Sequence, residues 1–314
     1  MIYYLKKIAI GVLLLCACHP HTSQDVARFL RQPTHTARAY DYIGHIEGAE
    51  YPCGSFSRPS GLAVDLDDHL YVADSGNHRV CKFGPDRRFL LTFGEFGWDA
   101  GQFQNPVDIA TDRSVHIYVV DSGNNRVEKY SHQGVPLSTL FDEDHASFER
   151  LAGIGFGQQG EIYVTDQDRD QILRFDLFGN LLGAIGGFGY EPGNLNRPRG
   201  IWVAESGDMY VADAGNERIQ AFNAIGNVKR EFLAVSPSLK KPTAVTGDQN
   251  GNIFVADAIE KAIFVFDQKG ELLLTIRDYR IQEVADLAID RQGVLYIADI
   301  GMEQIHLLQI EYEL

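Results

Sequence analysis

Two aspartates, Asp108 and Asp286, are the residues of this 314-residue chain that are best placed for chemistry. They occupy the same position in two copies of an internal repeat, and four other copies have a small residue there: Gly61, Gly153, Gly200 and Ala244. If this position faces a central channel, the two carboxylates and nearby backbone carbonyls suit a hard cation such as Ca²⁺. We expect calcium as an optional ligand and no required cofactor. The alternative is that each carboxylate caps its own local turn.

Aromatic and charged residues gather in and beside the long turns between repeats, at 94–106, 142–152, 186–198, 233–242 and 277–285. Aromatic anchors mixed with charges on loops are typical of surfaces that recognise a protein, a peptide or a glycan. The residues that we expect to contact such a partner are Trp98, Asp99, Tyr190, Arg199 and Tyr279. The alternative is that they are scattered loop residues that simply face solvent.

The elements that position these residues follow from a Tyr-Val-x-Asp cluster. It occurs six times and ends at Asp74, Asp121, Asp166, Asp213, Asp257 and Asp299, which lie 42 to 47 residues apart. This period, with several β-rich runs in each unit, is the sequence signature of a propeller built from four-stranded blades. The cluster is predicted to be the second strand, and the strand before it the innermost. We therefore expect an all-β fold in which residues 39–314 form one six-bladed β-propeller.

The two ends of the repeat region are predicted to complete one blade together. The last unit ends after its third strand, Gln304–Ile310, and a β-like run, Tyr42–Ile46, precedes the first unit. If that run is the missing fourth strand of the last blade, the ring closes and no long strand edge is left exposed.

The segments that follow three of the clusters, Asp74–Val80, Asp121–Val127 and Asp213–Ile219, resemble NHL repeats. Both a Gly-Asn pair and an Arg five residues after the Asp carry the resemblance. In the other three units Gln171, Ala262 and Gln304 replace the Arg. We expect the Asp to cap the following turn, Gly and Asn to take its left-handed positions, and the Arg to bond back to the Asp. These conspicuous residues are therefore predicted to be structural.

One NHL-type propeller enzyme, peptidyl-hydroxyglycine amidating lyase, holds zinc through histidines that follow the proline at the start of inner strands. Ser60, Val107, Arg199 and Thr243 occupy that position here, so the resemblance does not extend to the zinc chemistry. Asp108 and Asp286 echo the calcium position of that enzyme. The formal charge of −15 disfavours binding to nucleic acid, because an acidic surface repels phosphates.

Two cysteines, Cys53 and Cys81, lie in the predicted propeller. Cys53 lies in a loop and Cys81 in a predicted strand, so a disulfide between them is possible in an oxidising compartment. Because their separation does not follow from the sequence, two separate buried thiols are the alternative.

Residues 1–17 have the composition of a targeting segment, with Lys6 and Lys7 before an apolar run that is too short to span a bilayer. Leu15-Cys16-Ala17-Cys18 resembles the lipobox of bacterial lipoproteins, which implies cleavage before Cys18 and lipid attachment to its sulfur. An ordinary signal peptide that ends in Cys is the alternative. Residues 18–38 would then be a tether, and the protein would be lipid-anchored in the bacterial envelope, at the outer membrane and facing the periplasm.

These observations favour a membrane-tethered binding or scaffold propeller that recognises a protein, peptide or glycan partner through its loop rim. No residue is assigned a catalytic role on this reading. The alternative is a metal-assisted lyase or hydrolase in the axial funnel, with Asp108 and Asp286 as cation ligands and Arg199 holding an anionic group of the substrate.

Overall fold

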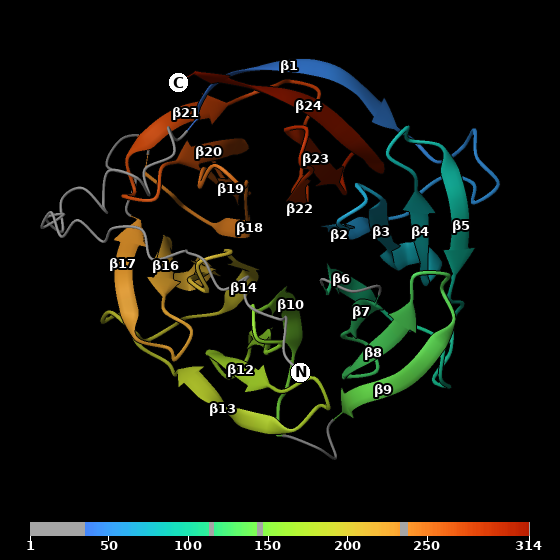
Figure 1. The fold of residues 1–314 in the computed structure, drawn as a ribbon, viewed down its shortest axis with the longest axis horizontal. Helices are drawn as coiled ribbons and strands as arrows, with labels where there is room; N and C mark the ends of the chain where they lie inside the picture. Colours follow the sequence, from blue (N-terminus) through green and yellow to red (C-terminus); the bar gives the residue numbers. More distant parts are fainter. Residues whose placement is uncertain (1–34, 113–115, 143–146, 233–237, 314) are drawn as a thin grey trace, which may run out of the picture. The chain divides into compact units, whose positions relative to one another are not determined.

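The computed structural model describes residues 35–112, 116–142, 147–232 and 238–313. Within this part of the chain the strands form six four-stranded antiparallel sheets. The sheets are arranged as blades around a central axis, with β2, β6, β10, β14, β18 and β22 nearest to it (Figure 1). The predicted all-β, six-bladed propeller is therefore confirmed.

Blades 1 to 5 each consist of four consecutive strands, called a to d from the axis outwards. Blade 1 contains β2 (Pro59–Val64), β3 (Leu70–Asp74), β4 (Arg79–Phe83) and β5 (Phe89–Phe93). Blade 2 contains β6 (Pro106–Thr111), β7 (His116–Asp121), β8 (Arg126–Ser131) and β9 (Pro136–Asp142). Blade 3 contains β10 (Leu151–Phe156), β11 (Ile162–Asp166), β12 (Gln171–Phe175) and β13 (Leu181–Gly186).

Blade 4 contains β14 (Pro198–Val203), β15 (Met209–Asp213), β16 (Arg218–Phe222) and β17 (Val228–Phe232). Blade 5 contains β18 (Pro242–Gly247), β19 (Ile253–Asp257), β20 (Ala262–Phe266) and β21 (Leu272–Ile276). Blade 6 combines β22 (Val284–Ile289), β23 (Val294–Asp299) and β24 (Gln304–Glu313) with β1 (Thr36–Ile46). We call the connection from strand d of one blade to strand a of the next a d–a loop.

The second strand of each blade is apolar on both faces because each face packs against a different neighbouring blade. In β3, Leu70 and Val72 belong to the core shared with blade 6, whereas Tyr71 and Ala73 belong to the core shared with blade 2. Burial of both faces explains why these strands lack the usual alternation of apolar and polar residues.

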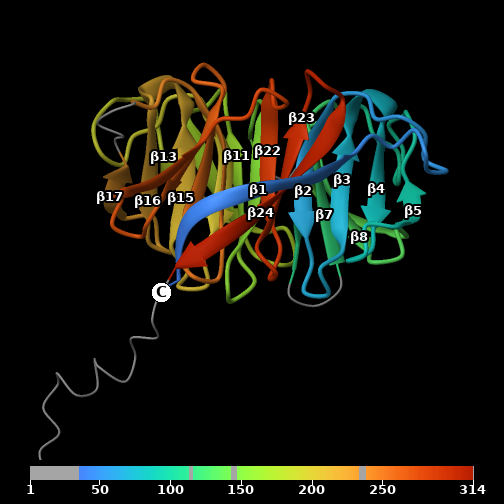
Figure 2. The same cartoon turned by 90° about the horizontal axis from the view of Figure 1, so that it is seen from above.

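Strand β1 closes the ring by pairing antiparallel with β24, from Thr36 opposite Glu313 to Ile46 opposite Ile305. The two strands lie across the outer edge of blade 6 (Figure 2). The predicted closure is consistent with this sheet, but the strand begins at Thr36 rather than at Tyr42. It is longer because β24 itself continues beyond Ile310 to Glu313 and offers backbone partners for the additional residues.

The aspartate that ends each second strand is buried and holds the d–a loop that enters its own blade. Asp121 accepts the backbone N–H groups of Gln104 and Asn105, and Asp257 accepts those of Lys240 and Lys241. The predicted cap of the following turn is found at Asp257 and Asp299, where backbone N–H groups of that turn also donate to the carboxylate. In NHL-like blades the loop is the main partner, an arrangement that the sequence analysis did not anticipate.

The arginine of the NHL-like units also reaches the d–a loop. Arg218 bonds Asp213 through Nε at 2.8 Å and donates to the carbonyls of Tyr190, Glu191 and Asn194. Arg79 bonds Asp74 in the same way, so the predicted Arg–Asp pair is confirmed in blades 1 and 4. In blade 2 the Nε of Arg126 lies 3.8 Å from Asp121 and 3.1 Å from Glu128, while its other nitrogens hold the loop carbonyls of Trp98, Asp99 and Gln102.

The Gly-Asn pair of the NHL-like turns does not take the left-handed positions predicted for it, although in blade 2 the left-handed residue is another asparagine, Asn125. The residue with positive φ is the one just before the third strand in every blade: His78, Asn125, Asp170, Glu217, Lys261 and Glu303. Gly76 and Gly123 are needed for space instead, since a Cβ on Gly76 would lie 2.7 Å from the Ser57 carbonyl oxygen and one on Gly123 would lie 2.9 Å from Asn105 N. The d–a loop therefore packs directly on the turn.

The N-terminal predictions fall mostly outside the described residues. Cys18 and nearly all of the tether proposed for 18–38 lie there, although Thr36, Ala37 and Arg38 belong to β1. No helix in the part of the chain that the structure describes has the length and apolar character needed to cross a membrane.

The ring closure can be tested with two chains that differ only in β1, one beginning at His35 and one beginning at Glu47. Removal of β1 exposes the edge of β24 and apolar residues that pack in the same core as β1, such as Leu308 and Ile310, so we expect the shorter chain to melt on the order of 10 °C lower or to remain unfolded. The measurement is thermal unfolding followed by circular dichroism. Equal melting temperatures for the two chains would contradict the closure.

Candidate functional site

Equivalent positions of the six innermost strands form one ring around the axis, which we call the waist. Each blade contributes one member from its innermost strand: Gly61, Asp108, Gly153, Gly200, Ala244 and Asp286. Neighbouring strands approach closely at this level, since a Cβ on Gly61 would lie 2.5 Å from the Asp108 Cα and one on Gly200 would lie 2.9 Å from the Ala244 Cα. Small residues are therefore required beside the two aspartates.

Two cavities open from the waist in opposite directions. The upper funnel, about 370 Å³, lies on the side of the d–a loops and is lined by residues such as Arg150, Arg199 and Lys241. The lower funnel, about 230 Å³, lies on the opposite side and is lined by apolar side chains such as Trp202 and Phe156. Asp108, Gly200 and Asp286 line both. The channel thus has charged side chains at one end, apolar side chains at the other, and carboxyl groups between them.

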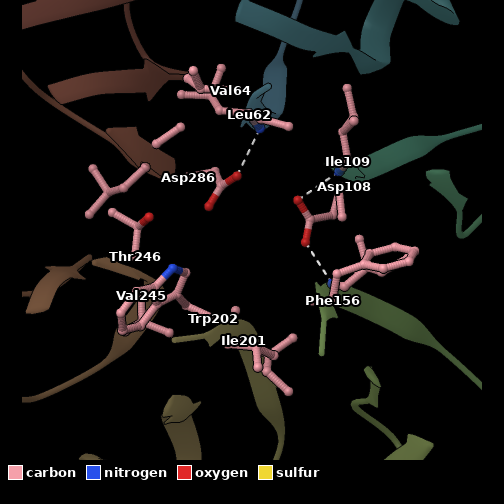
Figure 3. Close-up of a pocket in the computed structure, with 18 of the residues that line it drawn as sticks. Leu62, Val64, Asp108, Ile109, Phe156, Ile201, Trp202, Val245, Thr246 and Asp286 are labelled. Atoms are coloured by element: carbon pink, nitrogen blue, oxygen red, sulfur yellow. Dashed lines mark hydrogen bonds between the residues drawn. The ribbon is translucent and has the colours of Figure 1, made fainter. Parts of the chain in front are cut away.

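Asp108 and Asp286 each bind the backbone of the next blade around the ring. Asp108 accepts the N–H of Ile154 at 2.8 Å, and Asp286 accepts the N–H of Leu62 at 2.8 Å (Figure 3). Asp108 also accepts the N–H of Ile109 in its own strand. These N–H groups belong to innermost strands, whose inner edges have no further strand to pair with. The carboxylates therefore cap neighbouring strands rather than a local turn.

The environment of this pair favours its protonated form. Burial raises the pKa of Asp108 well above its ordinary range, and the facing Asp286 carboxyl raises it further. Burial also raises the pKa of Asp286, to about 7, although the N–H groups of Leu62 and Leu287 oppose the shift. At neutral pH the waist therefore retains at least one proton.

The predicted calcium site has only part of a ligand set. Among the described residues, no group of three or more His, Cys, Asp and Glu side chains is arranged to hold a metal ion. A hard cation takes six to eight oxygens, so at the waist water and backbone carbonyls would have to supply most of them around Asp108 and Asp286. Calcium binding stays a prediction.

Two d–a loops on the upper face, 94–105 and 187–197, share one backbone design. In each, an aromatic residue forms an isolated bridge to the end of its own loop: Phe96 to Phe103, and Phe188 to Leu195. Arg126 and Arg218 fasten the carbonyls of these loops, as described above. Both loops are therefore held rigidly to the blades that follow them, blades 2 and 4.

These two loops present aromatic pairs to solvent. Phe96 and Trp98 are 54% and 64% exposed and meet edge to face at 5.2 Å, and Phe188 and Tyr190 are 66% and 69% exposed and meet edge to face at 5.8 Å. The sequence analysis named Trp98 and Tyr190 but not the two phenylalanines. The parallel Phe-Gly-Trp and Phe-Gly-Tyr triplets that begin at Phe96 and Phe188 were the signal that could have identified them.

The predicted rim residues are not gathered into one site. Trp98 and Asp99 lie between blades 1 and 2, Tyr190 between blades 3 and 4, and Tyr279 between blades 5 and 6. Tyr279 is 89% exposed and lies under the guanidinium of Arg280 at 5.5 Å. Arg199 is half-buried in the upper funnel rather than on the rim. The face therefore combines separate aromatic projections with a central cavity.

Cys53 and Cys81 are both buried in the core between blades 6 and 1, and both thiols are free. The interaction with Cys81 lowers the pKa of Cys53 to about 7, and the interaction with Cys53 together with burial raises the pKa of Cys81. The loop thiol and the strand thiol are thus neighbours. Their pairing as a disulfide stays a prediction.

Comparison with known proteins agrees with this fold. The sequence model of the NHL repeat matches residues 56–83 and 103–130, in blades 1 and 2. The chain is therefore a six-bladed β-propeller that contains NHL repeats. A curated relative, the protein named Brain tumor of Drosophila melanogaster, is 32% identical over 78 residues, which are 24% of this chain and only 8% of that protein.

Solved structures with a similar fold include two lyases and a nidogen/laminin complex. A streptogramin B lyase superposes with a TM-score of 0.61 over 87% of this chain and 98% of its own, at 14% identity. Virginiamycin B lyase from Staphylococcus aureus gives 0.62 over 87% and 100%, at 12% identity. A chain of a nidogen/laminin complex gives 0.60 over 77% and 85%, at 23% identity. At these identities the likeness establishes the fold alone.

The raised pKa values at the waist predict that stability falls as the pH rises. Below about pH 4 the two carboxyl groups are protonated in both the folded and the unfolded chain. Between about pH 4 and about pH 7 they ionise more readily in the unfolded chain, which is thereby stabilised relative to the folded chain. Substituting Asp108→Asn together with Asp286→Asn keeps an oxygen acceptor at each position and removes the ionisation. Between about pH 5 and about pH 8, we expect the free energy of unfolding to fall by on the order of 2 kcal/mol less in this variant than in the wild type.

Urea unfolding at the two pH values measures this difference, with the exposed Asp67→Asn as the matched control. The same pH dependence in the wild type and the double variant would show that the waist carboxyls are not held protonated.

Proposed function

We propose that this protein is a binding propeller whose upper face recognises a protein, peptide or glycan partner. The observation that carries the proposal is the pair of rigid d–a loops, 94–105 and 187–197, which display the exposed aromatic pairs Phe96–Trp98 and Phe188–Tyr190. Rigid aromatic side chains are the groups most often responsible for binding energy at interfaces, because they bury a large area at a small cost in conformational entropy.

The loops are fastened in a way that suits recognition. Arg126 and Arg218 each hold three carbonyls of one loop, so the aromatic residues need not be ordered when a partner binds. Preorganisation of this kind increases affinity without new contacts. Because these bonds occupy the guanidinium groups of Arg126 and Arg218, the two arginines are not expected to contact the partner directly.

The proposal includes a location in the bacterial cell envelope. It rests on the N-terminal residues: the lipobox-like segment that ends at Cys18 would carry the lipid, and the residues after it would connect the lipid to β1. The upper face would then be offered to a partner at the membrane or in the periplasm.

The rim is tested by substituting Phe96→Ala together with Trp98→Ala. If these rings are anchors, recovery of the partner from a membrane extract and its measured affinity should fall by about tenfold or more, because truncation of an aromatic anchor typically costs 2 kcal/mol or more. Partners would be identified by mass spectrometry and their affinity measured by surface plasmon resonance.

Phe178→Ala is the matched control, because Phe178 is 84% exposed but lies on the turn between β12 and β13, at the opposite face. The proposal requires the rim variant to lose the partner and the control to keep it. Equal recovery with both would rule out the aromatic loops as the recognition surface.

A second candidate function is a metal-assisted lyase or hydrolase that uses the axial channel. The observation that favours it is the facing pair Asp108–Asp286, which lines both funnels at a position that a ligand could reach from either end. The similar fold of virginiamycin B lyase is compatible with a channel enzyme, although the identity of 12% transfers no residue role.

The metal requirement of this second candidate is tested by titrating calcium chloride into the protein in a calorimeter. A channel cation predicts that about one ion binds per chain. This binding should be lost in Asp108→Asn and in Asp286→Asn, because a neutral amide cannot replace a carboxylate ligand. Asp86→Asn, at an exposed aspartate of blade 1, is the control. Absence of binding to the wild type would leave the metal-assisted mechanism without its ion.

A further inference from the structure

Arg199 is a half-buried arginine whose guanidinium has no carboxylate partner among the described residues. Burial lowers its pKa, and the nearby Arg197 and Arg150 lower it further. A cation withdrawn from water normally gains a counter-ion or hydrogen-bond acceptors, because the loss of hydration is costly. Arg79 and Arg218, which are also partly or fully buried, each have such a partner in Asp74 and Asp213.

The cavity around Arg199 is cationic in a chain whose formal charge is −15. The upper funnel is lined by Arg150, Arg199 and Lys241, and by one acidic side chain away from the waist, Glu283. Arg150 is already paired with Asp168. Lys241 is exposed, and the part of the structure that is described gives its ammonium no ion pair. Two positive groups in the funnel are therefore available to a ligand.

Arg199 is also held by a rigid backbone. Its carbonyl accepts the hydroxyl of the buried Thr165 at 2.6 Å, and the same hydroxyl oxygen accepts the N–H of Gly153. The following residue, Gly200, packs directly against Ala244 of the next blade, where even a Cβ would be too close. A binding residue on a strand that is fixed from both sides is oriented before the ligand arrives.

The floor of the funnel repels an anion less than two free carboxylates would. The raised pKa values of Asp108 and Asp286 leave at least one proton on the pair at neutral pH, so the waist carries less negative charge. The volume of about 370 Å³ is at the lower end of the range of small-molecule sites, and it is larger than a bare inorganic ion requires.

We propose that the upper funnel binds an oxyanion, the carboxylate or phosphate group of a small ligand or of a peptide end, with Arg199 as the principal contact and Lys241 as a second. A guanidinium can engage either group with two parallel hydrogen bonds, and an ammonium adds a point charge. The site goes beyond the rim function proposed above and does not depend on it. The rim aromatics and the funnel can each be tested alone.

The experiment titrates the intact protein with three probes: inorganic phosphate, a short acetylated peptide with a free C-terminal carboxylate, and the same peptide with an amidated C-terminus. Calorimetry and nuclear magnetic resonance report binding. We expect at least one of the first two probes to bind, and the amidated peptide to bind about tenfold more weakly than the free one if the carboxylate is the group recognised. Preference for phosphate over both peptides would identify a phosphate ligand instead.

Three variants locate the site. Arg199→Gln should weaken binding by about tenfold or more, Arg199→Lys should retain part of it, and Lys241→Gln should have a smaller effect of about twofold to fivefold. Arg169→Gln is the matched control, because Arg169 lies in the turn between β11 and β12 at the same face, pairs with Glu149 and does not line the funnel.

Thermal unfolding of Arg199→Gln is measured as well. A melting temperature equal to that of the wild type excludes loss of the fold as the cause of lost binding. The proposal is overturned if neither phosphate nor the free peptide binds the wild type at about 10 mM, the range of the weakest specific sites. It is equally overturned if Arg199→Gln binds the probes as the wild type does. Neither result would affect the proposed role of Phe96 and Trp98.

Discussion

The propeller depends on six buried carboxylates, one at the end of the second strand of each blade: Asp74, Asp121, Asp166, Asp213, Asp257 and Asp299. Each accepts backbone N–H groups from the loop that enters the same blade, 16 or 17 residues earlier in the chain. A buried charge of this kind is tolerated only because several donors surround it, and removal of the donors would cost several kcal/mol. The carboxylate thus fixes, on its own blade, the end of the loop that arrives from the outer strand of the preceding blade. Where an NHL arginine is present, the guanidinium extends this network into the loop itself, and loops 94–105 and 187–197 become rigid platforms for aromatic side chains.

Much of this architecture could be predicted from the sequence because it is periodic. The repeat of Tyr-Val-x-Asp gave the number of blades, and the missing strand after Gln304–Ile310 matched the orphan run at Tyr42–Ile46. The Arg–Asp pair was predicted correctly in blades 1 and 4. The bonds of the Asp and the Arg to the d–a loop were not predicted, since a local turn was the nearest candidate and the loop lies more than 15 residues away. The left-handed position of the turn was also assigned to the Gly-Asn pair by propensity, whereas it belongs to the residue after that pair. Gly76 and Gly123 are needed because the loop packs tightly against them.

The candidate sites were predicted less completely, for a different physical reason. The approach of Asp108 and Asp286 to the channel follows from their place in the repeat, but their bonds to Ile154 and Leu62 depend on the register between blades, which has no sequence signature. Arg199 was expected on the rim and lies in the funnel, because the loop before it ends one residue earlier, at Arg197, and β14 has already turned towards the axis. The exposure of Phe96 and Phe188 could have been suspected from the matching triplets alone.

The pairing of β1 with β24 has a mechanical consequence. Any tension applied to the chain ahead of Thr36 enters the propeller through β1, and it loads the ladder that also closes the ring. Thr36 lies opposite Glu313, at the far end of β24. The pulled strand therefore separates from β24 beginning at the Thr36–Glu313 pair rather than in the middle of the blade. The strand that closes the ring is thus also the strand that receives the load. The resistance of the protein to being pulled open is set by the backbone bonds and side chains of the β1–β24 pair.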